Sequence, residues 1–295
     1  MEAVAFFAHF GVWWAVQFVV QSHVPTWIAE AVGGRAAAAL AYRATRTGFP
    51  TSVEDLQKLV DASQRRSRRE VGMLAVELLH AVMASHMALT SDVGALALWE
   101  HSPASKTMLL VTGSYFAWDF AAMVHYGDDW DVLNRAQTVM GLLACLAAGA
   151  GTSKSFAHFT LGALVMMQVS SVFLHLMVLC SELDRAVNRG RYSFATFWPA
   201  ATKVCRVLFV ATFAGIRLVW IPFKTVQWIN VLGADIGNSR ALVLATCIVG
   251  YNTVNWMWGF QMARGLYTIL KPATAGSGLN GLAFTEDGRA FKRTL

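Results

Sequence analysis

Long apolar runs alternate with short polar stretches along the whole chain. A helix needs about 20 apolar residues to cross the hydrocarbon core of a membrane. Each such run must be helical, because the hydrocarbon offers no water to bond to the backbone. The sequence therefore predicts an all-α fold, a polytopic bundle of about seven transmembrane helices. The predicted spans are residues 3–24, 71–90, 108–124, 132–150, 156–180, 204–223 and 241–270.

The composition agrees with a protein surrounded by lipid. The chain is 56% hydrophobic and 14% charged, whereas soluble domains carry about 25% charged residues. The net charge of +6 does not indicate a nucleic-acid partner, because the Lys and Arg residues lie in short loops and form no basic groove. The four cysteines form no CxxC pair, so we expect neither a disulfide framework nor a metal site.

Most basic residues fall on one side of the membrane in the predicted topology. If the chain crosses seven times, eighteen Lys and Arg fall on one side, four on the other, and two within the sixth run. Cytosolic loops normally carry this excess. The richest stretch is residues 64–70, QRRSRRE. It determines topology, contacts anionic headgroups, or does both, and the headgroup candidates are Arg65, Arg66, Arg68 and Arg69.

Several polar side chains lie inside the predicted spans. Such groups are costly in hydrocarbon and usually face the interior of a bundle. They either join helices through hydrogen bonds worth about 0.6 kcal/mol each, or line a polar chamber that binds a lipid headgroup. Asp119 would be very costly alone, so we expect it to be buried with a partner such as Arg217 or His80. The candidate residues of the chamber are His80, Asp119, Gln168, His175 and Arg217.

Five segments occur in an order that resembles the TLC-domain family (TRAM, LAG1 and CLN8 homology). Residues 67–89 resemble the basic approach and first span of the family domain, with a central His80. The segment GSYFAWDF at 113–120 is similar to the family's "GYFxxD", and 209–223 resembles its "FFxxRIxxxP" helix. Residues 159–179 and 252–270 resemble its "E-hydrophobic-S-x-x-F-L-x-L-R" span and its final Trp-centred helix.

The departures from the family pattern concern catalysis. Ceramide synthases of this family carry an adjacent His-His pair early in the span after the "YFxxD" helix, where residues 133–136 here read Leu-Asn-Arg-Ala. The acidic residue of the family's later span is Gln168 here. An acyl-CoA-dependent N-acyltransferase would therefore lack its general base. The resemblance implies a lipid-facing TLC bundle, and these departures argue against ceramide synthesis. We assign no catalytic residues.

Three functions stay open at this point. The first is a non-catalytic TLC-domain protein that binds or senses membrane lipid, with a bound phospholipid or sphingolipid and no other cofactor. The second is an accessory subunit of a larger membrane complex, with other membrane subunits as partners. The third is a divergent lipid N-acyltransferase.

The chain divides into three expected regions. Residues 1–64 hold the first span and the basic loop, 65–272 form the TLC-like transmembrane domain, and 273–295 form a flexible tail. The tail ends in Lys292-Arg293-Thr294-Leu295, which resembles the dibasic retrieval signal of endoplasmic-reticulum proteins, an address read by a receptor. We therefore expect a multi-pass protein of the endoplasmic reticulum, with a mitochondrial or other organelle inner membrane as the alternative.

The charge pattern predicts that the two termini lie on opposite sides of the membrane. We expect residues 64–70 and the tail on the cytosolic or matrix side, because that side takes the basic excess. Protease protection and cysteine labelling of both ends in sealed vesicles measure this. Termini found on the same side would contradict a seven-span topology.

Overall fold

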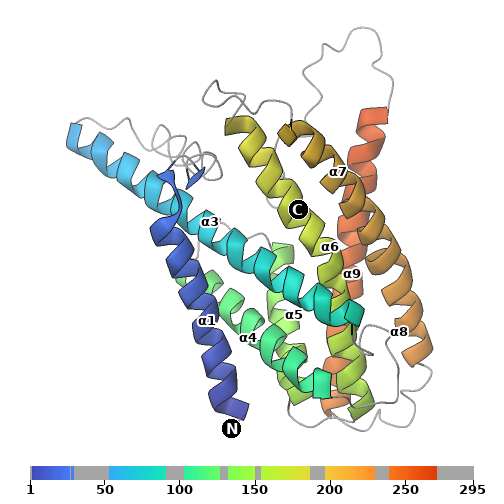
Figure 1. Cartoon of the computed structure of the whole chain (residues 1–295). Helices are drawn as coiled ribbons and strands as arrows, with labels where there is room; N and C mark the ends of the chain where they lie inside the picture. The colour runs from blue at the N-terminus through green and yellow to red at the C-terminus, as the bar shows by residue number, and fades with distance from the viewer. Residues whose placement is uncertain are drawn as a thin grey trace. The chain divides into compact units, whose positions relative to one another are not determined.

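The computed structural model describes residues 2–26, 28–29, 53–90, 103–126, 132–149, 154–186, 197–229 and 239–270. The elements in this part of the chain are helices, which confirms the predicted all-α class (Figure 1). The predicted tail, with Lys292 and Arg293, lies outside the described residues. The elements are α1 (Glu2–His23), α3 (Val53–Thr90), α4 (Pro103–Tyr126), α5 (Val132–Gly149), α6 (Lys154–Ala186), α7 (Phe197–Thr212), η2 (Phe213–Trp220), α8 (Ile221–Ile229) and α9 (Ser239–Leu270).

Each predicted span corresponds to one helical segment, with α7, η2 and α8 forming a single continuous segment. Within the described residues, five segments are long and apolar enough to cross a membrane. They are Ala3–His23, Gln57–Thr90, Thr107–Tyr126, Gly162–Asp184 and Phe197–Trp228. This confirms a polytopic helical membrane protein. The crossings of α5 and α9 stay predictions.

Helix α3 is longer than the span predicted within it. It begins at Val53 with Glu54 and Asp55 in its first turn, where acidic side chains favour a helix start. No Gly or Pro interrupts residues 53–71, so the start and the span join into one helix of 38 residues. At 1.5 Å per residue the helix is about 57 Å long, against about 30 Å of hydrocarbon. Its charged N-terminal part therefore extends beyond the hydrocarbon core.

The helices divide into two compact units. Unit 1 comprises Met1–Phe10, Val82–Ser170 and Phe209–Leu295, and unit 2 comprises Gly11–Ala81 and Ser171–Leu208. The boundaries fall within α1, α3, α6 and α7. Each unit has its own packing and its own polar side chains, described separately below.

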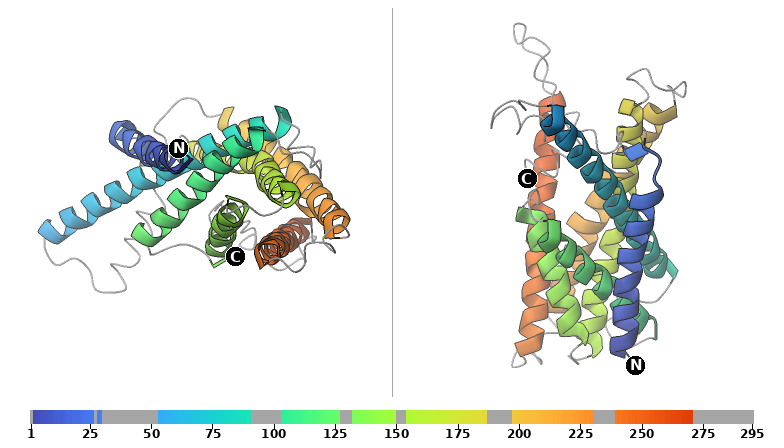
Figure 2. Two further views of the ribbon diagram at one scale, coloured as in Figure 1. Left: turned by 90° about the horizontal axis from the view of Figure 1, so that it is seen from below. Right: turned by 90° about the vertical axis from the view of Figure 1, so that its left-hand side faces the viewer.

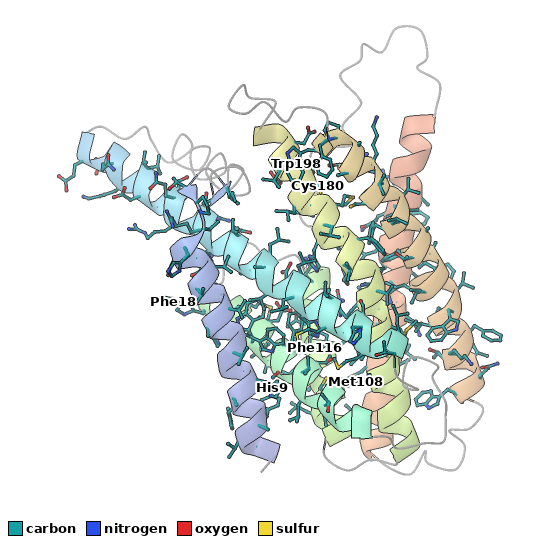
Figure 3. All side chains as sticks on the ribbon, viewed as in Figure 1. His9, Phe18, Met108, Phe116, Cys180 and Trp198 are labelled. Atoms are coloured by element: carbon teal, nitrogen blue, oxygen red, sulfur yellow. The ribbon has the colours of Figure 1, made fainter. Side chains whose placement is uncertain are left out.

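In unit 1, α5 packs against α4 on one side and α9 on the other (Figure 2). A Cβ atom at Gly141 of α5 would lie 2.5 Å from the ring of Phe116 and 2.6 Å from the hydroxyl of Tyr251. A Cβ at Gly250 of α9 would overlap the sulfur of Met140. Glycine therefore lets α5 approach both neighbours closely, as small residues do between membrane helices. Met108, on the same helix as Phe116 (Figure 3), lies in a buried apolar cluster with Ala84, Ala88 and Val165.

In unit 2, the C-terminal end of α1 is fastened to α3. A Cβ at Gly72 would lie 2.6 Å from Cγ of Gln21 and 2.9 Å from the carbonyl oxygen of Gln17, so the two helices cross closely there. Arg68 donates hydrogen bonds to the carbonyl oxygens of Gln21 (3.2 Å) and Val24 (3.4 Å). These carbonyls lie at the end of α1, where they lack partners within the helix. Arg68 therefore caps α1.

Replacing Gly141 by alanine should destabilise the protein. The new Cβ would overlap two rigid rings, Phe116 and Tyr251, and overpacking of this kind costs about 1–3 kcal/mol. We expect G141A to lower the melting temperature of the detergent-solubilised full chain, measured by tryptophan fluorescence. The matched control is G11A, because a Cβ at Gly11 meets no atom within 4 Å. Equal melting temperatures for G141A and the wild type would contradict the close packing of α5.

Candidate polar sites within the helices

The centre of the polar site in unit 1 is the guanidinium of Arg217, which is 3% exposed. Its Nε donates to Oγ of Ser170 at 2.7 Å, and its Nη2 donates to the carbonyl oxygen of Met167 at 2.8 Å. Its Nη1 donates to Oδ1 of Asn255 at 3.4 Å. These bonds join η2 to α6 and α9. The same guanidinium lies 5.3 Å from the ring centroid of Phe213, within the range of a cation–π contact.

Arg217 lies in a π-helical segment of eight residues, η2. The backbone N–H of Ile221 bonds to the carbonyl oxygen of Ile216, five residues back. Pro222 follows at once. Proline has no N–H to donate, and its ring clashes with the carbonyl four residues earlier. The widened turn before Pro222 accommodates both effects, and π-helical turns occur frequently at functional sites.

Asp119 of α4 is buried, with 6% of its surface exposed. The hydroxyl of Thr138 on α5 donates to its Oδ2 at 2.7 Å. The expected burial of Asp119 is confirmed, and Thr138 is a donor that the structure describes. Pairing of Asp119 with Arg217 or His80 stays a prediction. A hydroxyl holds a carboxylate in place by a charge-assisted hydrogen bond, but it cannot store a proton as an imidazole does.

Unit 2 holds a separate group of ionisable side chains. Nδ1 of His175 on α6 lies 3.3 Å from Oε2 of Glu77 on α3. One turn further along α3, His80 is fully buried. The ring of Trp13 on α1 stands edge-on to His80, with the ring centroids 6.0 Å apart.

The five predicted chamber residues therefore fall into two groups. Asp119, Gln168 and Arg217 belong to unit 1, while His80 and His175 belong to unit 2. All but His175, which is half-buried, are buried. That these side chains line one lipid chamber stays a prediction.

The predicted set of chamber residues leaves out four side chains that contact its members: Glu77, Thr138, Ser170 and Asn255. Glu77 and Asn255 were recognisable as polar residues in spans, but spacing along one helix does not identify a partner on another. The sequence does not single out Thr138 and Ser170 as site residues, because single hydroxyl residues are common in membrane helices.

The four arginines near the start of the α3 span differ in their surroundings. Arg65 is exposed, whereas Arg66, Arg68 and Arg69 are half-buried. Arg66 lies 4.0 Å from Glu70, and Arg68 caps α1. Contact with lipid headgroups stays a prediction for all four, with Arg65 the most accessible. Among the described residues, no group of three or more His, Cys, Asp or Glu side chains could hold a metal ion.

Comparison with known proteins gives one match. The family model of the TLC domain (TRAM, LAG1 and CLN8 homology) matches residues 72–264, which is more than half of the chain. No curated protein and no solved structure matches significantly.

Removing the Thr138 hydroxyl should weaken the fold of unit 1. In T138V, Oδ2 of Asp119 would lose the donor described above, and a buried polar group left without its partner costs about 1–3 kcal/mol. We expect a lower melting temperature for the solubilised full chain. T138S keeps the hydroxyl and is the control. If T138V were as stable as T138S, the bond between α4 and α5 would contribute nothing.

Proposed function

The chain belongs to the TLC-domain family, and on that premise we propose that it binds membrane lipid without catalysing a reaction. It is a multi-pass integral membrane protein. The proposed ligand is a lipid with an anionic headgroup, held between helices of unit 1 near Arg217. Two features support this proposal, the charge of Arg217 and the surroundings of Asp119.

The buried charge of Arg217 carries the proposal. A charged side chain within a membrane-spanning segment is costly, and such residues normally mark a functional site. Arg217 is 3% exposed, and its described hydrogen bonds go to a hydroxyl, an amide oxygen and a backbone carbonyl. Each of these acceptors is neutral, and together the bonds orient the guanidinium. Phosphate and carboxylate headgroups are the components of a membrane that match a guanidinium best.

The surroundings of Asp119 support binding rather than catalysis. General acid–base catalysis needs a group that takes and returns a proton near the operating pH. Oδ2 of Asp119 accepts its hydrogen bond from Thr138, and α5 begins with Leu-Asn-Arg where the ceramide synthases resembled here carry their histidine pair. In this proposal Asp119 and Thr138 hold α4 against α5.

A second candidate function is supported by the surface of α9. Trp256 is 56% exposed and Phe260 is 72% exposed, one turn apart on the same helix. Large aromatic side chains are enriched where proteins meet one another. This favours the accessory-subunit function, in which α9 would meet a neighbouring membrane subunit. Isolation of the chain in a complex of fixed stoichiometry would support that function.

The proposed location is the membrane of the endoplasmic reticulum. The support is the family and the basic C-terminal sequence Lys292-Arg293-Thr294-Leu295. An organelle inner membrane is the alternative that accompanies the accessory-subunit function.

Lipid that co-purifies with the protein tests the proposal. We expect the full chain, extracted with its surrounding lipid in a polymer disc, to be enriched in one anionic lipid class relative to the starting membrane. The enrichment should persist in R217K, which keeps the positive charge, and disappear in R217Q. Quantitative mass spectrometry of the extracted lipids measures this.

The matched control is R206Q, which removes an exposed arginine from the same helical segment. It should leave the enrichment unchanged. A wild-type protein whose lipids match the starting membrane would contradict lipid binding, and an enrichment retained in R217Q would exclude Arg217 as the headgroup partner.

A further inference from the structure

Two cysteines on different helices of unit 2, Cys180 on α6 and Cys205 on α7, contact each other. A side-chain hydrogen bond joins their thiols, and both are free cysteines. Cys180 is 8% exposed, whereas Cys205 is half-buried. Figure 3 shows Cys180 near the end of α6, close to the start of α7, where Trp198 lies. The two thiols therefore lie where these consecutive helices meet.

The cysteine pair lies near one surface of the membrane. The apolar segment that starts with α7 has 32 residues, which is about 48 Å at 1.5 Å per residue, against about 30 Å of hydrocarbon. Its ends therefore reach the headgroup layer. Lys203 and Arg206 flank Cys205 and are exposed, as charged side chains near a helix end are when they extend to the headgroups. On α6, the apolar segment ends at Asp184, one turn after Cys180.

Two thiols in contact allow a reaction that a single buried thiol does not. A single buried cysteine behaves as a small apolar side chain, but two neighbouring cysteines can be oxidised to a disulfide if their side chains point toward each other. The hydrogen bond between Cys180 and Cys205 meets this condition. Reactive cysteines are typically partly exposed and near basic side chains, and Cys205 has both features. Cys205 is therefore the thiol that a reagent from water reaches first.

We propose that Cys180 and Cys205 are an oxidation site, at which small-molecule disulfides such as glutathione disulfide form a reversible disulfide bond between α6 and α7. This inference goes beyond lipid binding and is independent of Arg217, which belongs to the other unit. The predicted topology places the connection between α6 and α7 on the cytosolic or matrix side. Disulfides in cytosolic surroundings are usually transient and redox-sensing.

The proposed reaction is thiol–disulfide exchange in two steps. The sulfur of Cys205 loses its proton and attacks one sulfur of glutathione disulfide, whose S–S bond breaks and releases one glutathione thiolate. The sulfur of Cys180 then loses its proton and attacks the sulfur of Cys205, and the second glutathione leaves as a thiolate. The two released thiolates take up the two protons. Two protein thiols are thereby oxidised to one disulfide, and one glutathione disulfide is reduced to two glutathione molecules.

The experiment treats the full chain in polymer discs with glutathione disulfide, blocks the remaining thiols with iodoacetamide, and analyses the digested protein by mass spectrometry without reductant. In the wild type we expect a peptide cross-linked between Cys180 and Cys205, which dithiothreitol removes. C180S should stop at the first step and keep glutathione attached to Cys205. C205S should leave Cys180 unmodified, because Cys180 is buried. If C180S fails to fold, the wild type and C205S decide.

The other two cysteines supply a matched control. Cys145 on α5 and Cys247 on α9 belong to unit 1 and are 3% and 4% exposed, so both should stay reduced in the folded protein. C247S should form the same cross-link as the wild type. A wild type that keeps glutathione on Cys205 without the cross-link, or that gains glutathione on Cys180 in C205S, would overturn the proposal. Cross-links to Cys145 or Cys247 in comparable amounts would also overturn it, because they indicate random pairing in unfolded protein.

Discussion

A charged side chain within a membrane helix is stable only if neighbouring helices replace the hydrogen bonds that it loses to water. In unit 1 this applies to Arg217. Its three nitrogens reach Ser170 and Met167 on α6 and Asn255 on α9. Three helical segments must therefore keep a fixed mutual position. Asn255 in turn donates to the sulfur of Met167 at 3.3 Å, so one cluster of bonds sets the arrangement of η2, α6 and α9.

Close helix approach is the second condition in unit 1, because a hydrogen bond of about 3 Å does not span a wide gap between helices. Gly141 and Gly250 supply it where α5 meets α4 and α9. The approach also brings Tyr251 of α9 to α5, where its hydroxyl donates to the carbonyl oxygen of Gln137 at 2.9 Å. The small residues and the polar bonds therefore depend on each other, as expected where lipid provides no hydrophobic force between helices.

The helices themselves could be predicted from the sequence, and the contacts between them could not. Long apolar runs predict α1, α4 and α6, because hydrocarbon permits no other backbone conformation. Glu54 and Asp55 favour a helix start at Val53, but the extension of the predicted span at residues 71–90 back to that point was not expected. The π-helical turn was missed, because Pro222 signals a disturbance but not its form.

In the candidate site as well, the sequence predicts which side chains are buried but not which side chains they contact. Burial of Asp119 followed from the cost of an exposed carboxylate in hydrocarbon, and the structure confirms it. Its donor, Thr138, depends on the rotation of α5 about its axis, which apolar periodicity does not determine when most of a helix is apolar. The division of the five chamber residues between two units is likewise a property of the tertiary arrangement.

The difference between the two polar groups bears on what the chain can do within its family. A fold does not determine an activity, which depends on the residues placed in it. In unit 1, the described hydrogen bonds of Asp119 and Arg217 go to hydroxyl, amide and carbonyl groups, which do not titrate near neutral pH. In unit 2, the partner of Glu77 is an imidazole, the side chain that changes charge in that range. A fixed charge suits selection of a ligand by its headgroup. The acid in the segment that resembles the family's "GYFxxD" thus accepts its described hydrogen bond from a hydroxyl, whereas the carboxylate–imidazole contact lies between α3 and α6.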